Sequence, residues 1–154
     1  MADVVRRRRR DGRGGEEAAH AGEAGRVLTD PASRNTRWVG ITIDCANPTR
    51  LASFWSAILD IPATSEHGDD PGWATVGSRF DGWPRLTFQR VAEPKIGKVR
   101  IHLDIAVDDI DAGRRRVENL GGRWSGVRHD YDEGVVMVMR DPEDHEFCLV
   151  QFFR

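Results

Sequence analysis

The feature that most constrains the fold of this chain is an internal repeat. The stretches "ITIDCANPTRLASFWSAILDIPA" at 41–63 and "IHLDIAVDDIDAGRRRVENLGGR" at 101–123 share one layout. Each begins with the alternating apolar residues of a strand, meets a helix-capping residue and continues with apolar residues at helical spacing. Asn47, followed by Pro, caps the first helix, and Asp108 or Asp109 caps the second. The repeat therefore predicts a strand followed by a helix, used twice.

Three shorter strands are predicted after each helix, separated by segments rich in Gly, Asp and Pro that are typical of turns. These strands are 63–66, 73–76 and 85–91 in the first copy and 123–128, 135–140 and 146–152 in the second. The pattern predicts a β-α-β-β-β module one at 37–91 and a like module two at 99–154. Because a single helix covers one sheet poorly, we expect the modules to combine. The predicted fold is α+β, a cupped eight-strand mixed sheet with the helices outside.

Residues 1–36 differ in composition from the domain predicted at 37–154. They are rich in Gly, Ala, Arg and Glu and contain no Phe, Trp, Tyr or Ile. Such a segment buries too little apolar surface to offset the entropy lost on ordering, so we expect a disordered tail. The arginine run at 6–10 leaves open an interaction of the tail with a partner. The net charge of -2 does not favour nucleic acid.

The location of the protein is predicted from what its sequence lacks. No apolar run approaches the roughly 20 residues that a membrane span needs. No apolar stretch follows the arginines as it does in a secretion signal. Cys45 and Cys148 show neither a metal-knuckle nor a C-x-x-C spacing. We therefore predict free thiols in the reducing cytoplasm and no membrane partner.

Polar side chains break the apolar pattern of two predicted strands in module two. Within "VRIHLDIAVDDID" at 99–111, alternation puts His102 and Asp104 on one face of a strand, with aliphatic residues on the other. Glu146 and Cys148 likewise share one face of the last strand. We expect these four side chains to lie near one another on the concave side of the sheet.

This layout resembles the vicinal oxygen chelate superfamily, which includes the glyoxalase and bleomycin-resistance proteins. The resemblance is carried by "DCANPTRLASFWSAIL", "PRLTFQRVAEPKIGKVRIHLDIAVDD" and "DPEDHEFCLVQ" and covers 37–154. It is closest to the small glyoxalase-like proteins common in actinobacteria. It implies that the two modules enclose a small-molecule site and that the domain pairs as a homodimer.

The resemblance also implies a place for a divalent metal, which many enzyme members hold with the first and last strands of each module. His102 matches such a position, and its imidazole suits first-row divalent metals. The remaining positions depart from the pattern. They offer Gly40 or Thr42 on the first strand of module one, Leu86, Phe88 or Gln89 on its last strand, and Cys148, with Glu146 nearby, in module two. His102 and Glu146 thus form an incomplete metal site, and the cofactor stays undetermined.

Aromatic residues supply the other candidate contacts for a ligand. Trp38, Trp73 and Trp83 lie on or beside strands of module one and are predicted to wall a pocket. Packing in the core is the alternative for each of them. Thr42 and Cys148 are predicted to line the same pocket. The apolar strand around Cys148 favours a contact rather than a nucleophile, because burial raises the pKa of a thiol.

The sequence leaves two functions open. In the first, the domain binds a small organic molecule and acts as an isomerase or lyase. His102 would then transfer a proton, with Asp104 or Glu146 as its orienting partner. In the second, it binds and sequesters a drug or metabolite without catalysis, as the resemblance to the bleomycin-resistance proteins implies. Neither the ligand nor catalysis follows from the fold alone.

Overall fold

The computed structural model describes residues 38–64, 70–80 and 85–153, and it contains the predicted repeat. Residues 37–154 cluster as one compact unit. The tail at 1–36 lies outside the described residues, so its disorder stays a prediction. Module one contains β1 (Gly40–Cys45), α1 (Pro48–Leu59), β2 (Ala63–Thr64), β3 (Trp73–Val76) and β4 (Arg85–Arg90). Module two contains β5 (Asp104–Ala106), α2 (Ile110–Asn119), β6 (Arg123–Tyr131), β7 (Gly134–Arg140) and β8 (Glu146–Phe152).

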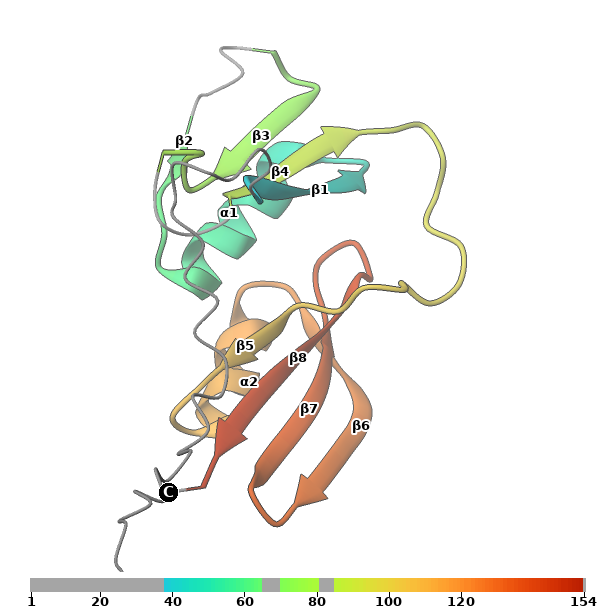
Figure 1. The fold of residues 1–154 in the computed structure, drawn as a ribbon. Coiled ribbons are helices and arrows are strands. Elements are labelled where there is room, and N and C mark those ends of the chain that lie inside the picture. The colour runs from blue at the N-terminus through green and yellow to red at the C-terminus, as the bar shows by residue number, and fades with distance from the viewer. Residues whose placement is uncertain (1–37, 65–69, 81–84, 154) are drawn as a thin grey trace, which may run out of the picture. The chain divides into compact units, whose positions relative to one another are not determined.

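The two modules have the same strand order. Hydrogen bonds join the strands as β1-β4-β3-β2 in one sheet and β5-β8-β7-β6 in the other (Figure 1). In each sheet the first and last strands of the module run parallel, and the remaining pairs are antiparallel. The predicted α+β fold of two β-α-β-β-β modules is confirmed, with its eight strands hydrogen-bonded as two four-stranded mixed sheets. Within the described residues, no helix combines the length and apolar character that crossing a membrane requires.

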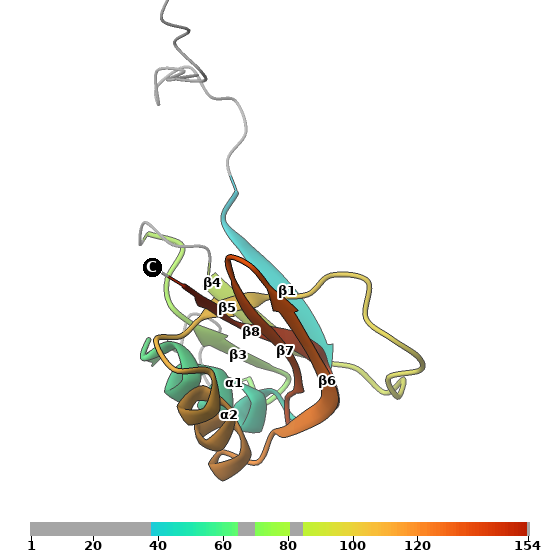
Figure 2. The same ribbon diagram turned by 90° about the horizontal axis from the view of Figure 1, so that it is seen from below.

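Both helices begin at the predicted caps. The Asn47 side chain accepts a hydrogen bond from the backbone amide of Arg50, and the next residue is a proline at the start of α1. Of the two candidates for α2, Asp109 is the cap, because its carboxylate accepts from the amide of Ala112. The helices lie beside each other (Figure 2), where Arg116 of α2 donates to the backbone carbonyl of Ala57 in α1.

An aromatic cluster joins the two modules. Phe54 and Trp55 from α1 meet Phe147 from β8, with ring centroids 6.1 and 4.9 Å from the Phe147 ring. The buried carboxylate of Asp141, in module two, accepts a hydrogen bond from the Trp55 indole at 3.3 Å. The Glu143 carboxylate accepts from the amides that precede α1, at 2.6 and 2.7 Å. Module one therefore completes its core with side chains of module two.

The strand predicted to begin at Val99 is shorter than expected. Only Asp104–Ala106 pairs as β5, and Ile101, predicted to be buried, is 76% exposed. The register provides the reason. Asp104 lies opposite Cys148, and β8 begins only two residues before that, so residues 99–101 have little of β8 left to pair with. The amide of Val99 instead donates to the Glu146 carboxylate at 3.2 Å.

Candidate functional site

Each sheet has one face turned toward the core and one turned away from it. The apolar residues of β4 and β8 that pack in the core are Leu86, Phe88, Phe147 and Leu149. Side chains alternate along a strand, so the intervening residues form the other face. We call these the module-one face (Thr42, Asp44, Thr64, Trp73, Thr75, Thr87 and Gln89) and the module-two face (Asp104, Ala106, Val127, His129, Val136, Val138, Arg140, Glu146, Cys148 and Val150).

The middle row of side chains differs between the two faces. Directly paired residues across module one are all threonines: Thr42, Thr87, Thr75 and Thr64, from β1, β4, β3 and β2. The helix caps make Thr42 the equivalent of Asp104, so the corresponding row of module two is Asp104, Cys148, Val138 and Val127. A row of hydroxyls in one module is thus replaced by an apolar row with a polar end in the other.

The polar end of this row is a compact cluster. The His102 Nδ1 atom lies 3.7 Å from the Cys148 sulfur, within hydrogen-bonding range for a thiol. Burial, and then a hydrogen bond to the Asp104 carboxylate, raise the pKa of the Cys148 thiol to about 11. Cys148 is therefore a neutral thiol at ordinary pH, as expected from its apolar strand. In the part of the chain that the structure describes, no hydrogen bond joins His102 to Asp104.

Glu146 lies at the same end of the face but is engaged by cations. Its carboxylate is 3.2 Å from Lys95 and 3.5 Å from Arg140, and it accepts the amide of Val99. Burial alone raises the pKa of Glu146, but the hydrogen bonds from Val99 and Lys95 outweigh it and hold the pKa at about 2. Glu146 is thus an ionised, buried anchor for the end of the linker between the modules (residues 92–98), and its contacts are with Lys95, Val99 and Arg140 rather than with His102.

The residues present do not fit the divalent metal that the resemblance implies. By the register and the helix caps, His102 and Glu146 correspond to Gly40 and Arg85, which are paired in module one. A glycine has no ligating side chain, and a guanidinium repels a cation. Among residues 38–64, 70–80 and 85–153 there is no group of three or more His, Cys, Asp or Glu side chains that could hold a metal ion. We therefore derive no chemical step through a metal.

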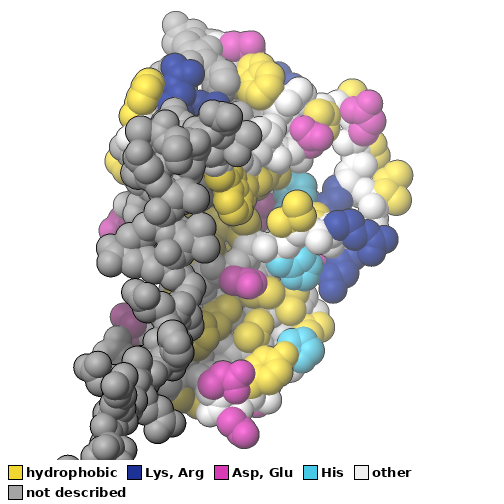
Figure 3. All heavy atoms as spheres, in the orientation of Figure 1, with side chains coloured by type: hydrophobic (Ala, Val, Ile, Leu, Met, Phe, Trp, Pro, Cys, Tyr) yellow, Lys and Arg dark blue, Asp and Glu magenta, His cyan; other side chains and the backbone are white. Residues whose placement is uncertain are grey.

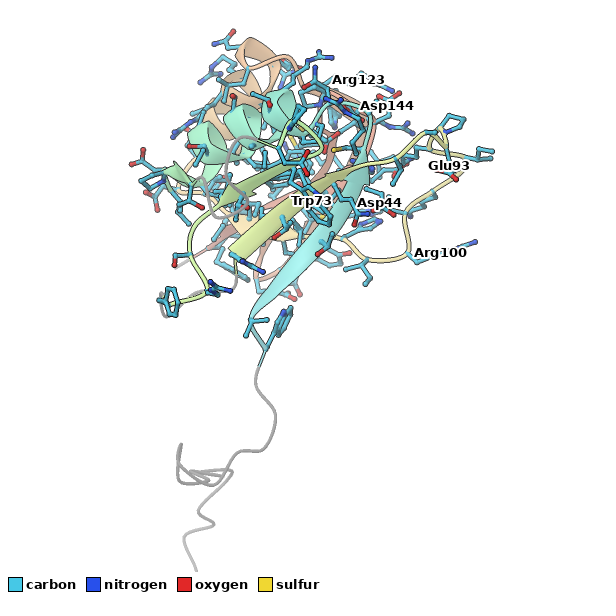
Figure 4. The ribbon with its side chains drawn as sticks, turned by 90° about the horizontal axis from the view of Figure 1, so that it is seen from above. Asp44, Trp73, Glu93, Arg100, Arg123 and Asp144 are labelled. Atoms are coloured by element: carbon cyan, nitrogen blue, oxygen red, sulfur yellow. The ribbon has the colours of Figure 1, made fainter. Side chains whose placement is uncertain are left out.

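The predicted aromatic wall is only partly present. Trp38 is 74% exposed, and its indole donates to the Gly40 carbonyl, so it contributes little enclosure. Trp73 is half-buried on the module-one face, in the same row as Asp44 (Figure 4). Thr42 and Asp44 border a cavity of about 350 Å³ beside residues 99–103. Trp83 lies outside the described residues.

Sequence reasoning missed a cavity on the module-two face. This cavity, of about 670 Å³, has the linker residues Lys95 and Lys98 on one side and Val127, Val138 and Arg140 among the strand residues on the other. We call it the linker cavity. One signal was present: the only two lysines of the chain are both in the linker between the modules. Its volume is in the range of small-molecule sites.

The match to a family model identifies the domain. Residues 40–150 match the model described as a glyoxalase-like domain. The chain belongs to the glyoxalase-like domain family. This confirms the resemblance to the vicinal oxygen chelate superfamily. The domain matches no curated protein.

Solved structures share the fold of this glyoxalase-like domain at low sequence identity. A glyoxalase/bleomycin resistance protein/dioxygenase family enzyme from Burkholderia phytofirmans has a TM-score of 0.60 at 13% identity, over 73% of this chain and 96% of that one. A glyoxalase/bleomycin resistance protein/dioxygenase from Nocardioides has a TM-score of 0.58 at 12% identity, over 79% of this chain and 86% of that one. A superfamily member from Sphaerobacter thermophilus has a TM-score of 0.56 at 14% identity, over 75% and 97%. These likenesses concern the fold alone.

Proposed function

We propose that this glyoxalase-like domain binds a small organic molecule on the module-two face, over the linker cavity. The observation that carries the proposal is the row formed by Val127, Val138, Cys148 and Asp104. Val127 is 41% exposed and Val138 is partly exposed, so this row offers apolar surface that ends in a polar group. Ligand sites are mostly apolar with a few convergent polar groups, which matches this arrangement.

The module-one face is the weaker candidate. Thr75 and Thr87, in the centre of its threonine row, are only 1% and 4% exposed. A ligand therefore has less access to the centre of this row than to Val127 and Val138 of module two. Thr42, at the edge of the row, remains exposed beside the smaller cavity. We place the principal contacts in module two and keep Thr42 as a contact at the border.

Binding without catalysis is the form of this function that the site contacts favour. Two residues were proposed to orient His102. Asp104 interacts with Cys148 instead, and Glu146 pairs with Lys95 and Arg140. The second candidate is an isomerase or lyase. It is favoured by the position of His102, whose half-buried imidazole lies at the polar end of the row, 3.7 Å from the Cys148 sulfur. His102 alone would then carry the proton transfer.

Methyl-selective NMR of the full-length protein tests the proposal. The probes are small organic acids, amines and neutral aromatic molecules, added singly. We expect a binding probe to shift the methyl signals of Val127, Val138 and Val150, while the core residues Val117 and Val135 provide an internal control. The proposal is wrong if probes shift only core signals or those of module one, or bind without moving any valine of this face.

A matched pair of variants locates the site. Val127→Gln places a longer, uncharged polar side chain on the apolar row, and we expect it to weaken probe binding several-fold. Thr42→Gln makes a like change on the exposed edge of module one, and we expect a smaller effect. For the catalytic alternative, the probes are followed over time. If the wild type converts a probe into a product, and His102→Gln still binds that probe but no longer converts it, the protein is an enzyme rather than a binding protein.

Two further parts of the proposal rest on the sequence rather than on the site. We propose that the domain forms a homodimer and works in the cytoplasm. Light scattering of the full-length protein measures its mass in solution, and a mass of one chain would contradict the first. Fractionation of the cells that produce it would contradict the second if the protein were recovered from the medium or the membrane.

A further inference from the structure

The linker cavity has a basic side and an apolar side. Lys95 and Lys98 approach it from the linker, and Arg140 from β7, whereas Val127 and Val138 form apolar surface on the sheet. Figure 3 shows Lys and Arg side chains gathered beside hydrophobic and His side chains on one face of the molecule. A cavity of this kind is suited to a molecule with two chemically different ends.

The acidic residues around the cavity are already engaged. Asp144 forms an ion pair with Arg123, and these two side chains point toward each other in Figure 4. The Glu143 carboxylate is directed at the amides of Ala46 and Asn47, before α1. Glu146, which is buried, is the remaining acid of the lining, and it faces two cations at once.

The cations are in excess at this place. Lys95 and Arg140 share the single negative charge of Glu146, at 3.2 and 3.5 Å. Lys98 is exposed, and it has no ion-pair partner within residues 38–64, 70–80 and 85–153. One buried carboxylate thus holds two cations at the mouth of the cavity while a third stays unneutralised. Such an arrangement attracts an anion and repels a cation.

We infer that the ligand of the linker cavity is an organic anion, of the carboxylate class, with an apolar body. Its carboxylate would lie among Lys98, Lys95 and Arg140, and its apolar body would cover Val127 and Val138. Lysine and arginine donate charge-assisted hydrogen bonds to a carboxylate, and the valines favour aliphatic or aromatic carbon. This inference rests on the proposed function, because it names the chemical class bound at the same face.

A series of probes that differ only in charge tests the inference on the full-length protein. Phenylbutyrate, phenylbutyramide and phenylbutylamine have the same apolar body and carry a negative, a neutral and a positive end group. We expect the carboxylate to bind about tenfold more tightly than the amide, and the amine to bind most weakly. Raising the salt concentration should weaken the binding of the carboxylate probe alone.

Charge reversal at two neighbouring positions identifies the cation involved. We expect Lys98→Glu to weaken phenylbutyrate binding about tenfold and to leave phenylbutyramide unchanged. Arg100→Glu is the matched control. Arg100 is exposed two residues after Lys98 but does not line the cavity, and Figure 4 shows it pointing away from the domain. It should change phenylbutyrate binding less than about twofold. Both substitutions are on the surface, so neither should unfold the protein.

The outcomes separate this inference from the proposed function. Equal binding of the carboxylate and the amide, with shifts at the valine methyls, would overturn the anion class and leave small-molecule binding intact. Tighter binding of the amine would do the same. Binding of phenylbutyrate that Lys98→Glu and Arg100→Glu weaken equally would overturn the site and indicate general attraction to charge. Binding of phenylbutyrate at the cavity with loss only in Lys98→Glu supports the inference.

Discussion

Module one and module two have one backbone plan but two different surfaces. Their strand orders and helix caps coincide, and both turn apolar side chains of their last strands toward the core. On the face away from the core, the row of four threonines in module one corresponds to a row of an acid, a thiol and two valines in module two. The residues on the core face are thus alike in type in the two modules, and those on the opposite face differ in type.

The difference also extends to the helices. α1 buries Leu51, Phe54 and Trp55, and it reaches the aromatic side chain of β8. α2 buries only Ile110 and Val117 among its own residues and is followed by an exposed Leu120. α1 therefore contributes more to the shared core than α2, and module two presents more open apolar surface. This open surface supports ligand contact by module two.

The largest expected effect comes from removing the side chain that the two modules share. Phe147 is buried against Phe54 and Trp55, so Phe147→Ala leaves a cavity at the junction. We expect it to lower the free energy of unfolding by about 3–5 kcal/mol. Urea denaturation followed by tryptophan fluorescence and circular dichroism measures the loss. Both signals should change in one transition, because each module depends on the other.

A control on the same strand sharpens this result. Phe152 lies at the end of β8 and is 65% exposed, so Phe152→Ala should cost less than about 1 kcal/mol. Two separate transitions in Phe147→Ala, of which only one is shifted, would show that the modules are stable units on their own. The two modules would then not share one core, and the comparison between them could not rest on it.

A smaller effect is expected from the threonine row. Thr75 is buried, and its hydroxyl has no hydrogen-bond partner among the described residues. A buried unsatisfied hydroxyl costs free energy, and valine has nearly the same shape without it. We therefore expect Thr75→Val to raise the free energy of unfolding by about 1 kcal/mol, measured by urea denaturation.

Thr64, in the same row, provides the matched control. Its hydroxyl donates to the Gly77 carbonyl at 3.0 Å, so Thr64→Val removes a hydrogen bond and should lower the free energy of unfolding by about 1 kcal/mol. Loss of stability in both variants would mean that the Thr75 hydroxyl has a partner in solution. The module-one face would then be a second polar site, and the contrast between the faces would weaken.

The sequence was sufficient for the fold because the fold depends on local signals. Asn47 followed by proline and the apolar spacing around Trp55 are read within one helix, and the repeat gives the same elements twice. The site depends on contacts between distant segments. The Glu146 carboxylate accepts from the amide of Val99 and pairs with the ammonium of Lys95, and these contacts occupy a residue that was predicted to ligate metal. No spacing in the sequence reports such a contact, so the linker cavity was missed.

The finest comparison is between the two cysteines, one in each module. Burial, followed by carboxylates led by Glu143, raises the pKa of Cys45 to about 12, whereas the Asp104 contact helps to raise the pKa of Cys148 to about 11. Asp104→Asn removes the negative charge beside Cys148 only. Its pKa should fall toward the ordinary value of 9.0, so the thiolate becomes more abundant at every pH below the pKa.

Alkylation by iodoacetamide at about pH 8, followed for each cysteine by mass spectrometry, measures this change. We expect Cys148 in Asp104→Asn to react several-fold faster than in the wild type, and Cys45 in the same molecule to keep its rate. Equal acceleration of both cysteines would indicate loosening of the whole domain. An unchanged rate at Cys148 would mean that the carboxylate does not touch the thiol. Asp104 would then be free to pair with His102, and the catalytic alternative would regain the orienting partner that the present contacts withhold.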